Sequence, residues 1–140
     1  MMDYLDKINQ MKLEKPLHPE EMDTLEKTFG FTLPEQYKEF LLLHNGGEGP
    51  VGEYGYIAIF GLEELASSNG EDKINEYHPE LFYFASDRGG MIYAFDKSQN
   101  QTPIVELPCD SIDNDDVEIV AENFNDFISY IYNIDDSAFD

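Results

Sequence analysis

Residues 25–47 read LEKTFGFTLPEQYKEFLLLHNGG, and this stretch decides the fold because it predicts two helices joined by a tight link. Pro34 stands where the second helix would begin, a position at which proline's missing N–H costs nothing and its fixed φ helps. Apolar side chains then recur at helical spacing and turn one face toward a core, with His44 near the end of that face. Gly30 would end the first helix, and residues 45–47 would end the second in the left-handed conformation.

Four segments of the chain resemble the sequence signature of the SUKH superfamily. They are residues 31–40 (FTLPEQYKEF), 45–48 (NGGE), 87–96 (DRGGMIYAFD) and 123–128 (NFNDFI), in the order typical of that superfamily. Asn123 stands where the superfamily usually has serine, and both residue types are strong helix N-caps. The resemblance spans residues 20–132. Its motifs are structural, so they indicate a fold directly and an activity only indirectly.

The SUKH superfamily comprises bacterial immunity proteins related to a fungal regulator of cell-wall assembly. The resemblance therefore implies an immunity protein, or antitoxin, that binds and neutralises a cognate polymorphic toxin encoded beside it, often a nuclease, by direct protein contact. The fungal relatives imply an alternative, a regulatory module that recruits cell-wall or signalling proteins, although this chain lacks long disordered flanks. A small hydrolase is the last alternative, because no nucleophile, base and orienting group stand together in the sequence.

Length and composition predict one domain. A chain of 140 residues can build a single core, and ten Phe and nine Tyr are too many for a disordered protein. Cys109 is the only cysteine, so the chain forms no internal disulfide. The N-terminus lacks the pattern of a signal peptide, and no apolar run approaches the ~20 residues that span a bilayer. We expect a cytoplasmic protein with one domain over residues 1–134 and an acidic tail over residues 135–140.

The charge of the chain limits its partners. Thirty acidic residues against eight basic ones give a formal net charge of −22. Such a field repels nucleic acid and anionic membranes, and it speeds association with basic proteins. Excess acid can also serve solubility alone. Together with the resemblance, the charge favours a basic toxin as partner and argues against direct binding of nucleic acid or membrane. We expect the chain to be a monomer.

The pattern of apolar residues predicts an α+β domain, with a mostly antiparallel central sheet between N-terminal and C-terminal helices. A glycine-rich loop over residues 46–55 separates the predicted helices from the strands. Small helices are expected at residues 62–66 and 72–77. The predicted strands are residues 56–60, 81–85, 91–95, 103–107 and 117–120, and the last helix follows Asn123. The side chains expected to be buried and helical are Leu33, Tyr37, Phe40, Leu41, Phe124, Phe127 and Ile131.

Catalytic and metal-binding patterns match only in part. Residues 47–52 have the letters of a dinucleotide fingerprint, but they follow a helix and contain a proline. One cysteine cannot complete a zinc-deaminase site. The acidic run 110–116 lacks the spacing of an EF-hand, which leaves at most a weak cation site. His44 is interpreted as a hydrogen-bonded or helix-end side chain. We therefore expect no catalytic residue, no metal site and no cofactor.

Partner-binding residues are expected in three acidic connections, because connecting segments carry function more often than the elements they join. Acidic side chains would form the rim of an interface, and exposed tyrosines would anchor it. The candidate residues are Glu48, Glu53, Tyr54 and Tyr56 after the central helix, Asp87 in a hairpin, and Asp110, Asp113, Asp115, Asp116 and Glu118 before the last helix.

Overall fold

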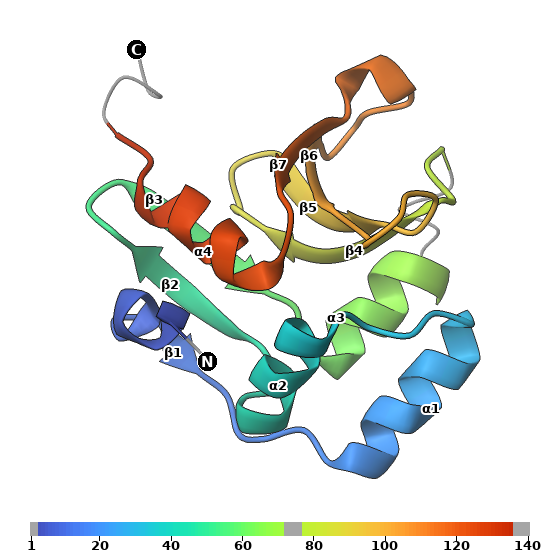
Figure 1. The fold of residues 1–140 in the computed structure, drawn as a ribbon, viewed down its shortest axis with the longest axis horizontal. Helices are drawn as coiled ribbons and strands as arrows, with labels where there is room; N and C mark the ends of the chain where they lie inside the picture. Colours follow the sequence, from blue (N-terminus) through green and yellow to red (C-terminus); the bar gives the residue numbers. More distant parts are fainter. Residues whose placement is uncertain (1–2, 72–76, 136–140) are drawn as a thin grey trace.

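The chain folds around an antiparallel sheet of seven strands, whose order in space is their order in the sequence (Figure 1). The structure, a computed structural model, describes residues 3–71 and 77–135. Each strand pairs antiparallel with the next. The strands are β1 (Lys12–Leu13), β2 (Gly47–Val51), β3 (Gly55–Ile59), β4 (Leu81–Ser86), β5 (Met91–Asp96), β6 (Ile104–Pro108) and β7 (Glu118–Ala121). The predicted α+β class is confirmed.

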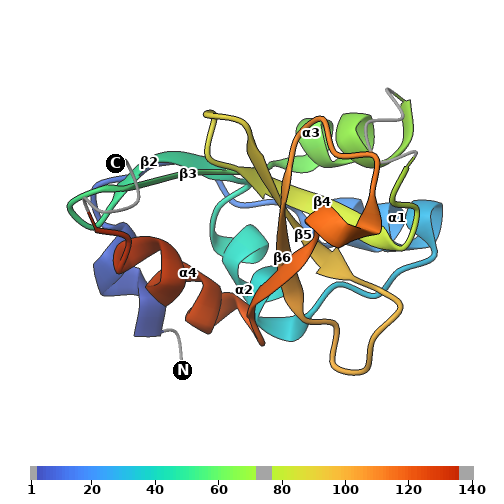
Figure 2. The same ribbon diagram turned by 90° about the horizontal axis from the view of Figure 1, so that it is seen from above.

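Helices from both ends of the chain flank this sheet. In the described residues the α-helices are α1 (Pro19–Phe29), α2 (Glu35–Leu43), α3 (Leu62–Ala66) and α4 (Phe124–Tyr132). The helical turns of other types are η1 (Asp3–Ile8), η2 (Ser67–Glu71) and η3 (Asn114–Asp116). Figures 1 and 2 show α2 and α4 side by side against the sheet. The predicted arrangement, with helices before and after the strands, is therefore correct.

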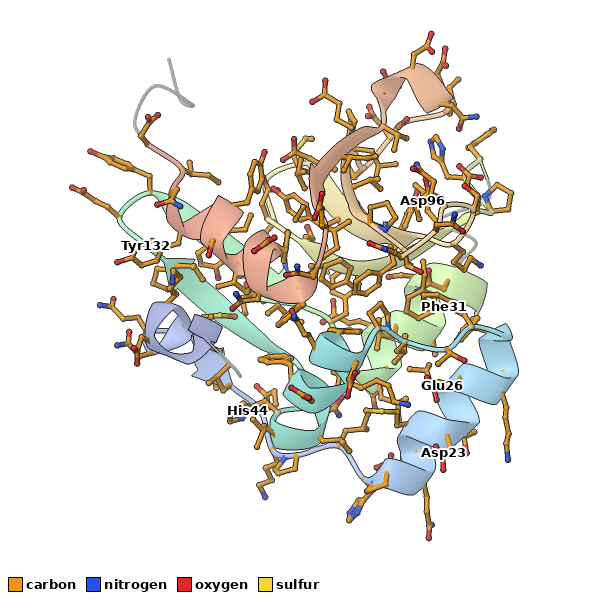
Figure 3. The ribbon with its side chains drawn as sticks, in the orientation of Figure 1. Asp23, Glu26, Phe31, His44, Asp96 and Tyr132 are labelled. Carbon is orange, nitrogen blue, oxygen red and sulfur yellow. The ribbon has the colours of Figure 1, made fainter. Side chains whose placement is uncertain are left out.

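The two-helix unit forms as its sequence predicts. Gly30 ends α1 with a φ of 60°, a left-handed conformation that glycine adopts without a clash at Cβ. Pro34 then precedes the first residue of α2. Glu26 of α1, labelled in Figure 3, ties the two helices together. Its carboxylate accepts a 2.7 Å hydrogen bond from the Leu33 N–H and lies 3.3 Å from the Lys38 ammonium.

Two side chains of this unit differ from the prediction. Leu33 is buried, as expected, but it lies in the link before α2 and is not helical. The reason is the following Pro34, which disfavours helical backbone at the residue before it. His44 follows the last residue of α2 with a φ of −147°, so it is a half-buried cap and not part of the inner face. Its Nδ1 atom lies 2.9 Å from the Glu14 carbonyl oxygen.

The sequence predicts that residues 45–47 end α2 in a left-handed conformation, but α2 ends earlier, at Leu43. The cap residue is His44, whose backbone is extended. Gly46 has a φ of +87°, and a Cβ placed there would lie 2.7 Å from the Ile59 carbonyl oxygen and from the Gly61 nitrogen. The Asn45 side chain accepts a 2.8 Å hydrogen bond from the Leu62 N–H, at the start of α3. The segment thus packs α2 closely against the end of β3.

The predicted glycine-rich loop over residues 46–55 is mostly strand. β2 pairs with β1 on one side and with β3 on the other, so only residues 52–54 form the connecting turn. Glycine and proline have low strand propensity, which is why the sequence predicts a loop at residues 47–51. Pairing on both sides overrides that propensity. The other predicted strands all form. Most of their ends differ from the predicted bounds by one residue.

Aromatic rings from the sheet and from two helices make the centre of the core. Phe84 on β4 stacks on Phe95 on β5 with ring centroids 4.3 Å apart. Tyr37 from α2 and Phe127 from α4 each contact Phe84, with a centroid separation of 5.2 Å in both cases. The side chains expected to be buried are buried: Leu33, Tyr37, Phe40, Leu41, Phe124, Phe127 and Ile131.

Asn123 caps α4 as predicted. Its side-chain oxygen accepts a 2.9 Å hydrogen bond from the Asp126 N–H, and its amide nitrogen lies 3.3 Å from the Asp126 carboxylate. The predicted helix at residues 72–77 lies outside the described residues, except for Tyr77, and so does most of the predicted tail at residues 135–140.

Candidate functional site

The residues predicted to bind a partner fall into three places on the surface. Glu53 and Tyr54 are exposed in the β2–β3 turn. Glu48, Tyr56 and Asp87 gather near the tip of the β4–β5 hairpin. Asp110, Asp113, Asp115, Asp116 and Glu118 belong to the β6–β7 connection and the start of β7. Figures 1 and 2 place the β2–β3 turn and the β6–β7 connection at separate ends of the molecule, so they cannot form one interface patch.

Arg88 organises the second of these places, at the tip of the hairpin. It is the only arginine of the chain. Its guanidinium Nη2 lies 3.2 Å from Glu48 Oε1 on β2 and 3.1 Å from Glu64 Oε2 on α3. The guanidinium also lies 5.9 Å from the ring centroid of Phe60. Arg88 has a φ of 59°, which is uncommon for a residue other than glycine. One cation therefore holds a sheet strand and a helix together.

Glu48 has a second partner in this place. The Tyr56 hydroxyl donates a 2.6 Å hydrogen bond to Glu48 Oε2. This bond, followed by the contacts with Arg88, lowers the pKa of the Glu48 carboxyl below its ordinary value of 4.5. The same bond raises the pKa of the Tyr56 phenol above its ordinary value of 10.0. Glu48 is thus held as a carboxylate at neutral pH, with two local partners already bound.

A groove of about 770 Å³ opens beside these residues. Acidic and basic side chains both line it, and the backbone of residues 45–47 forms part of its wall. The lining cations are Lys12, Lys15 and Arg88, and the lining acids are Glu14, Glu21, Glu48, Glu63 and Glu64. Its charges are therefore partly compensated within the chain.

Asp87 shapes the hairpin rather than facing a partner freely. Its Oδ1 atom accepts hydrogen bonds from the Gly89 N–H at 2.7 Å and from the Met91 N–H at 3.0 Å. The Ser86 hydroxyl oxygen accepts a 2.9 Å bond from the Arg88 N–H. Both side chains therefore hold the turn that positions Arg88.

The third place, residues 109–117 between β6 and β7, is termed the acidic loop. It contains the short turn η3, and Asp113 caps that turn by accepting a 3.0 Å hydrogen bond from the Asp115 N–H. Figure 1 shows the loop in orange, projecting from the sheet. Asp110, Asp113, Asp115 and Asp116 are all exposed. The loop therefore presents four carboxylates to solvent on a folded turn.

A buried histidine holds the acidic loop to the rest of the fold. His78 is fully buried, and its Nε2 atom lies 3.0 Å from the Ser111 hydroxyl while its Nδ1 atom lies 3.1 Å from the Asn114 side-chain oxygen. The Ser111 hydroxyl also lies 3.0 Å from the Asp116 carboxylate. Glu80 Oε1 is 3.8 Å from His78 Nδ1. These contacts bind the segment before β4 to the loop at Ser111 and at Asn114.

The hydrogen-bond partners of Ser111 and His78 indicate a structural role for these two residues and not a catalytic one. A hydrolytic serine needs an accessible hydroxyl and donors aimed at a developing oxyanion. The Ser111 side chain is nearly buried, and its hydroxyl is within hydrogen-bond distance of the Asp113 carbonyl oxygen and the Asp116 carboxylate as well as His78. The geometry therefore favours a clamp on the loop over a nucleophile.

Exposed apolar side chains collect around the acidic loop. The three most exposed large hydrophobic side chains in the described residues are Ile112, at 67%, Tyr77, at 57%, and Ile119, at 56%. Ile112 follows Ser111 within the loop, Tyr77 precedes His78, and Ile119 lies on β7. Tyr54 and Tyr56, the predicted anchors, are less exposed, at 40% each. Exposed apolar groups inside a charged rim are typical of protein interfaces.

Neither a metal centre nor a membrane span is found in the part of the chain that the structure describes. The described residues contain no group of three or more His, Cys, Asp or Glu side chains arranged to hold a metal ion. Among the same residues, no helix combines the length and the apolar character needed to cross a bilayer.

Three of these features were not predicted from the sequence. Arg88 could have been noticed as the only arginine in an acidic chain, at the tip of a predicted hairpin. Ile112 could have been noticed as an isoleucine within a run of aspartates in a predicted connection. No sequence pattern links His78 to Ser111, since 33 residues separate them.

Comparisons with known proteins agree with this fold. The sequence profile of the SMI1/KNR4 family (SUKH-1) matches residues 16–130. The chain is also 32% identical over 100 residues to a protein of Bacillus subtilis (strain 168) named "Uncharacterized protein YnaB". That alignment covers 71% of this chain and 64% of the relative, so the chain spans less than two thirds of the length of the relative.

Proposed function

Because the chain belongs to the SMI1/KNR4 family (SUKH-1), we propose that it is an immunity protein that binds and neutralises a bacterial toxin. The toxin is a basic protein domain encoded beside it, of the kind that grips nucleic acid. The chain acts in the cytoplasm, by direct contact and without catalysis. It covers the active site of the toxin or a surface next to it.

The observation that carries the proposal is the one-sided charge of the last part of the chain. No lysine or arginine follows Lys97, so β6, the acidic loop, β7 and α4 carry acidic residues with no cation among them. A toxin that cuts nucleic acid must be basic where it binds phosphates. An acidic protein surface can occupy that region and exclude the nucleic acid.

The arrangement of polar side chains supports binding over catalysis. Arg88 binds both Glu48 and Glu64, and His78 and Ser111 belong to a buried clamp. Such groups fix loops and strand ends in place. A preformed surface loses little conformational entropy when a partner binds, which favours tight inhibition.

Co-expression tests the proposal. Expression of the protein encoded by the neighbouring reading frame is induced in two strains. One strain expresses this chain and the other does not. We expect growth arrest without the chain, growth with it, and co-purification of the two proteins. The variant Phe127→Asp, which places a charge in the core, should not protect, because protection requires the folded chain. Arrest in both strains, or a neighbouring product that is not toxic, would contradict the proposal.

A further inference from the structure

We infer that the toxin docks on the acidic loop and the outer face of β7, with Ile112 and Ile119 as apolar anchors. This inference rests on the proposed function. The occupant is a basic protein surface with a shallow apolar pocket at its centre. The carboxylates of Asp110 and Asp115, both exposed, form part of the rim and meet lysine or arginine side chains of the toxin.

The two anchors are highly exposed. Ile112 and Ile119 have 67% and 56% of their surface exposed, more than the leucines on the outer face of α2, which have 39%. Most binding energy at interfaces comes from a few side chains that lose their water on docking. Ile112 stands within a loop, and no described neighbour covers it. Its exposed fraction is the largest among the large apolar side chains described, so most of its surface is available for burial by a partner.

The loop around Ile112 is held in place by hydrogen bonds. His78 is buried and binds Ser111, the residue directly before Ile112, and Asp113 caps the turn directly after it. Both neighbours of the anchor are therefore fixed in the free protein. A fixed anchor avoids the ordering cost that a mobile loop would add on binding.

The carboxylates of the acidic loop are not paired with any cation that the structure describes. None of the ion pairs among the described residues involves an acid of the loop, whereas Glu48 and Glu64 in the hairpin groove already bind Arg88. Tyr56, a predicted anchor, also has its hydroxyl bound to Glu48. A basic partner is therefore attracted more strongly to the acidic loop than to the groove. The charge difference therefore favours Ile112 and Ile119 over Tyr56 as anchors.

The experiment measures binding of the full chain to the purified toxin domain by surface plasmon resonance at several salt concentrations. One variant removes the anchors, Ile112→Ser with Ile119→Ser. A second variant reverses the charge of two rim carboxylates that no hydrogen bond in the loop uses, Asp110→Lys and Asp115→Lys. The matched apolar control is Leu42→Ser with Leu43→Ser on α2. The matched charge control is Asp23→Lys with Glu39→Lys, two exposed acids. Asp23 is labelled in Figure 3 on α1, away from the loop. Circular dichroism verifies that each variant is folded.

We expect the anchor variant to dissociate about tenfold faster or more, with little change in association rate. The rim variant should associate about tenfold more slowly and with a weaker dependence on salt. Both controls should stay within about threefold of the wild type. Wild-type binding with an unchanged anchor variant would overturn this docking surface and leave the proposed function standing. Failure of the wild type to bind would overturn both.

Discussion

The Nε2 atom of the buried His78 lies 3.0 Å from the hydroxyl of Ser111, although 33 residues separate them in the sequence. This contact joins the segment before β4 to the acidic loop. It places the exposed Ile112 next to a fixed point of the fold. The structure thereby combines a rigid attachment with an exposed, charged surface, as expected of a surface that binds a partner without rearranging.

Replacement of His78 should loosen the acidic loop. In His78→Ala, the nearly buried Ser111 loses its imidazole partner and a cavity remains, so we expect a loss of about 1–3 kcal/mol in the free energy of unfolding. Amide hydrogens of residues 111–116 should exchange faster with solvent. The control His18→Ala removes an exposed histidine that makes no cap bond. A loss below about 0.5 kcal/mol, with unchanged exchange, would show that His78 does not hold the loop.

Two adjacent leucines of α2 test which face of this helix forms the core. Leu41 is fully buried, whereas 39% of Leu42 is exposed. Leu41→Ala should lower the free energy of unfolding by about 2–5 kcal/mol, because it removes buried methyl groups and leaves a cavity. Leu42→Ala should cost less than about 1 kcal/mol. Urea denaturation of both variants measures the difference, and equal losses would mean that the helix faces are wrongly assigned.

Alanine substitutions at two glycines distinguish the cost of a left-handed backbone from the cost of a steric clash. Gly30 has a φ of 60°, and no atom lies within 4 Å of the position that a Cβ would take, so Gly30→Ala should cost about 1–2 kcal/mol from the left-handed backbone alone. Gly46→Ala adds a clash with the Ile59 carbonyl oxygen at 2.7 Å. We expect a further loss of about 1–3 kcal/mol at this position. Thermal unfolding of the two variants checks the order, which equal melting temperatures would contradict.

The bond between Tyr56 and Glu48 should appear in the pH dependence of stability. The bond lowers the pKa of Glu48 in the folded protein, so its stabilising effect is full above the ordinary value of 4.5 and is lost as pH falls through the lowered pKa. Tyr56→Phe should therefore be less stable than the wild type at neutral pH, and the difference should shrink on acidification. In nuclear magnetic resonance titrations, the pKa of Glu48 should rise in this variant. The phenol's own raised pKa acts at the alkaline end, where stability falls as pH rises above 10.0.

The matched control for this prediction is Tyr132→Phe. Tyr132 is exposed to a similar degree, at 43%, and its ring contact with Lys7 survives the substitution. The pKa of Glu48 should not change in the control. A stability difference for Tyr56→Phe that is the same at all pH values would mean that the hydroxyl acts on something other than the Glu48 carboxylate.

The helices and most strands could be predicted from the sequence because their signals are local. Periodic apolar residues indicate the buried face of α2, and Asn123 with Asp126 indicates the start of α4. The strand β2 could not be predicted, since it forms through pairing with β1 and β3 against its own low propensity. Tertiary contacts decide such segments.

The acidic composition of the candidate site could likewise be read from the sequence, but its geometry could not. Arg88 and Glu48 are 40 residues apart, and only the folded sheet and hairpin bring them together. The sequence therefore indicates acids and tyrosines in three connections without showing that Glu48 and Tyr56 bind each other. It also does not show that Ile112 is the most exposed large apolar side chain described.

The most direct test of the central claim is a titration of toxin activity in vitro. Purified toxin domain from the neighbouring reading frame is mixed with increasing amounts of this chain, and its remaining activity is measured. If the chain neutralises by binding, activity should fall linearly and reach zero at a fixed stoichiometric ratio, with weaker inhibition at high salt. Undiminished activity at an excess of the chain would contradict neutralisation. Complete loss of activity at a small fraction of that ratio would contradict binding as the mechanism and indicate catalysis.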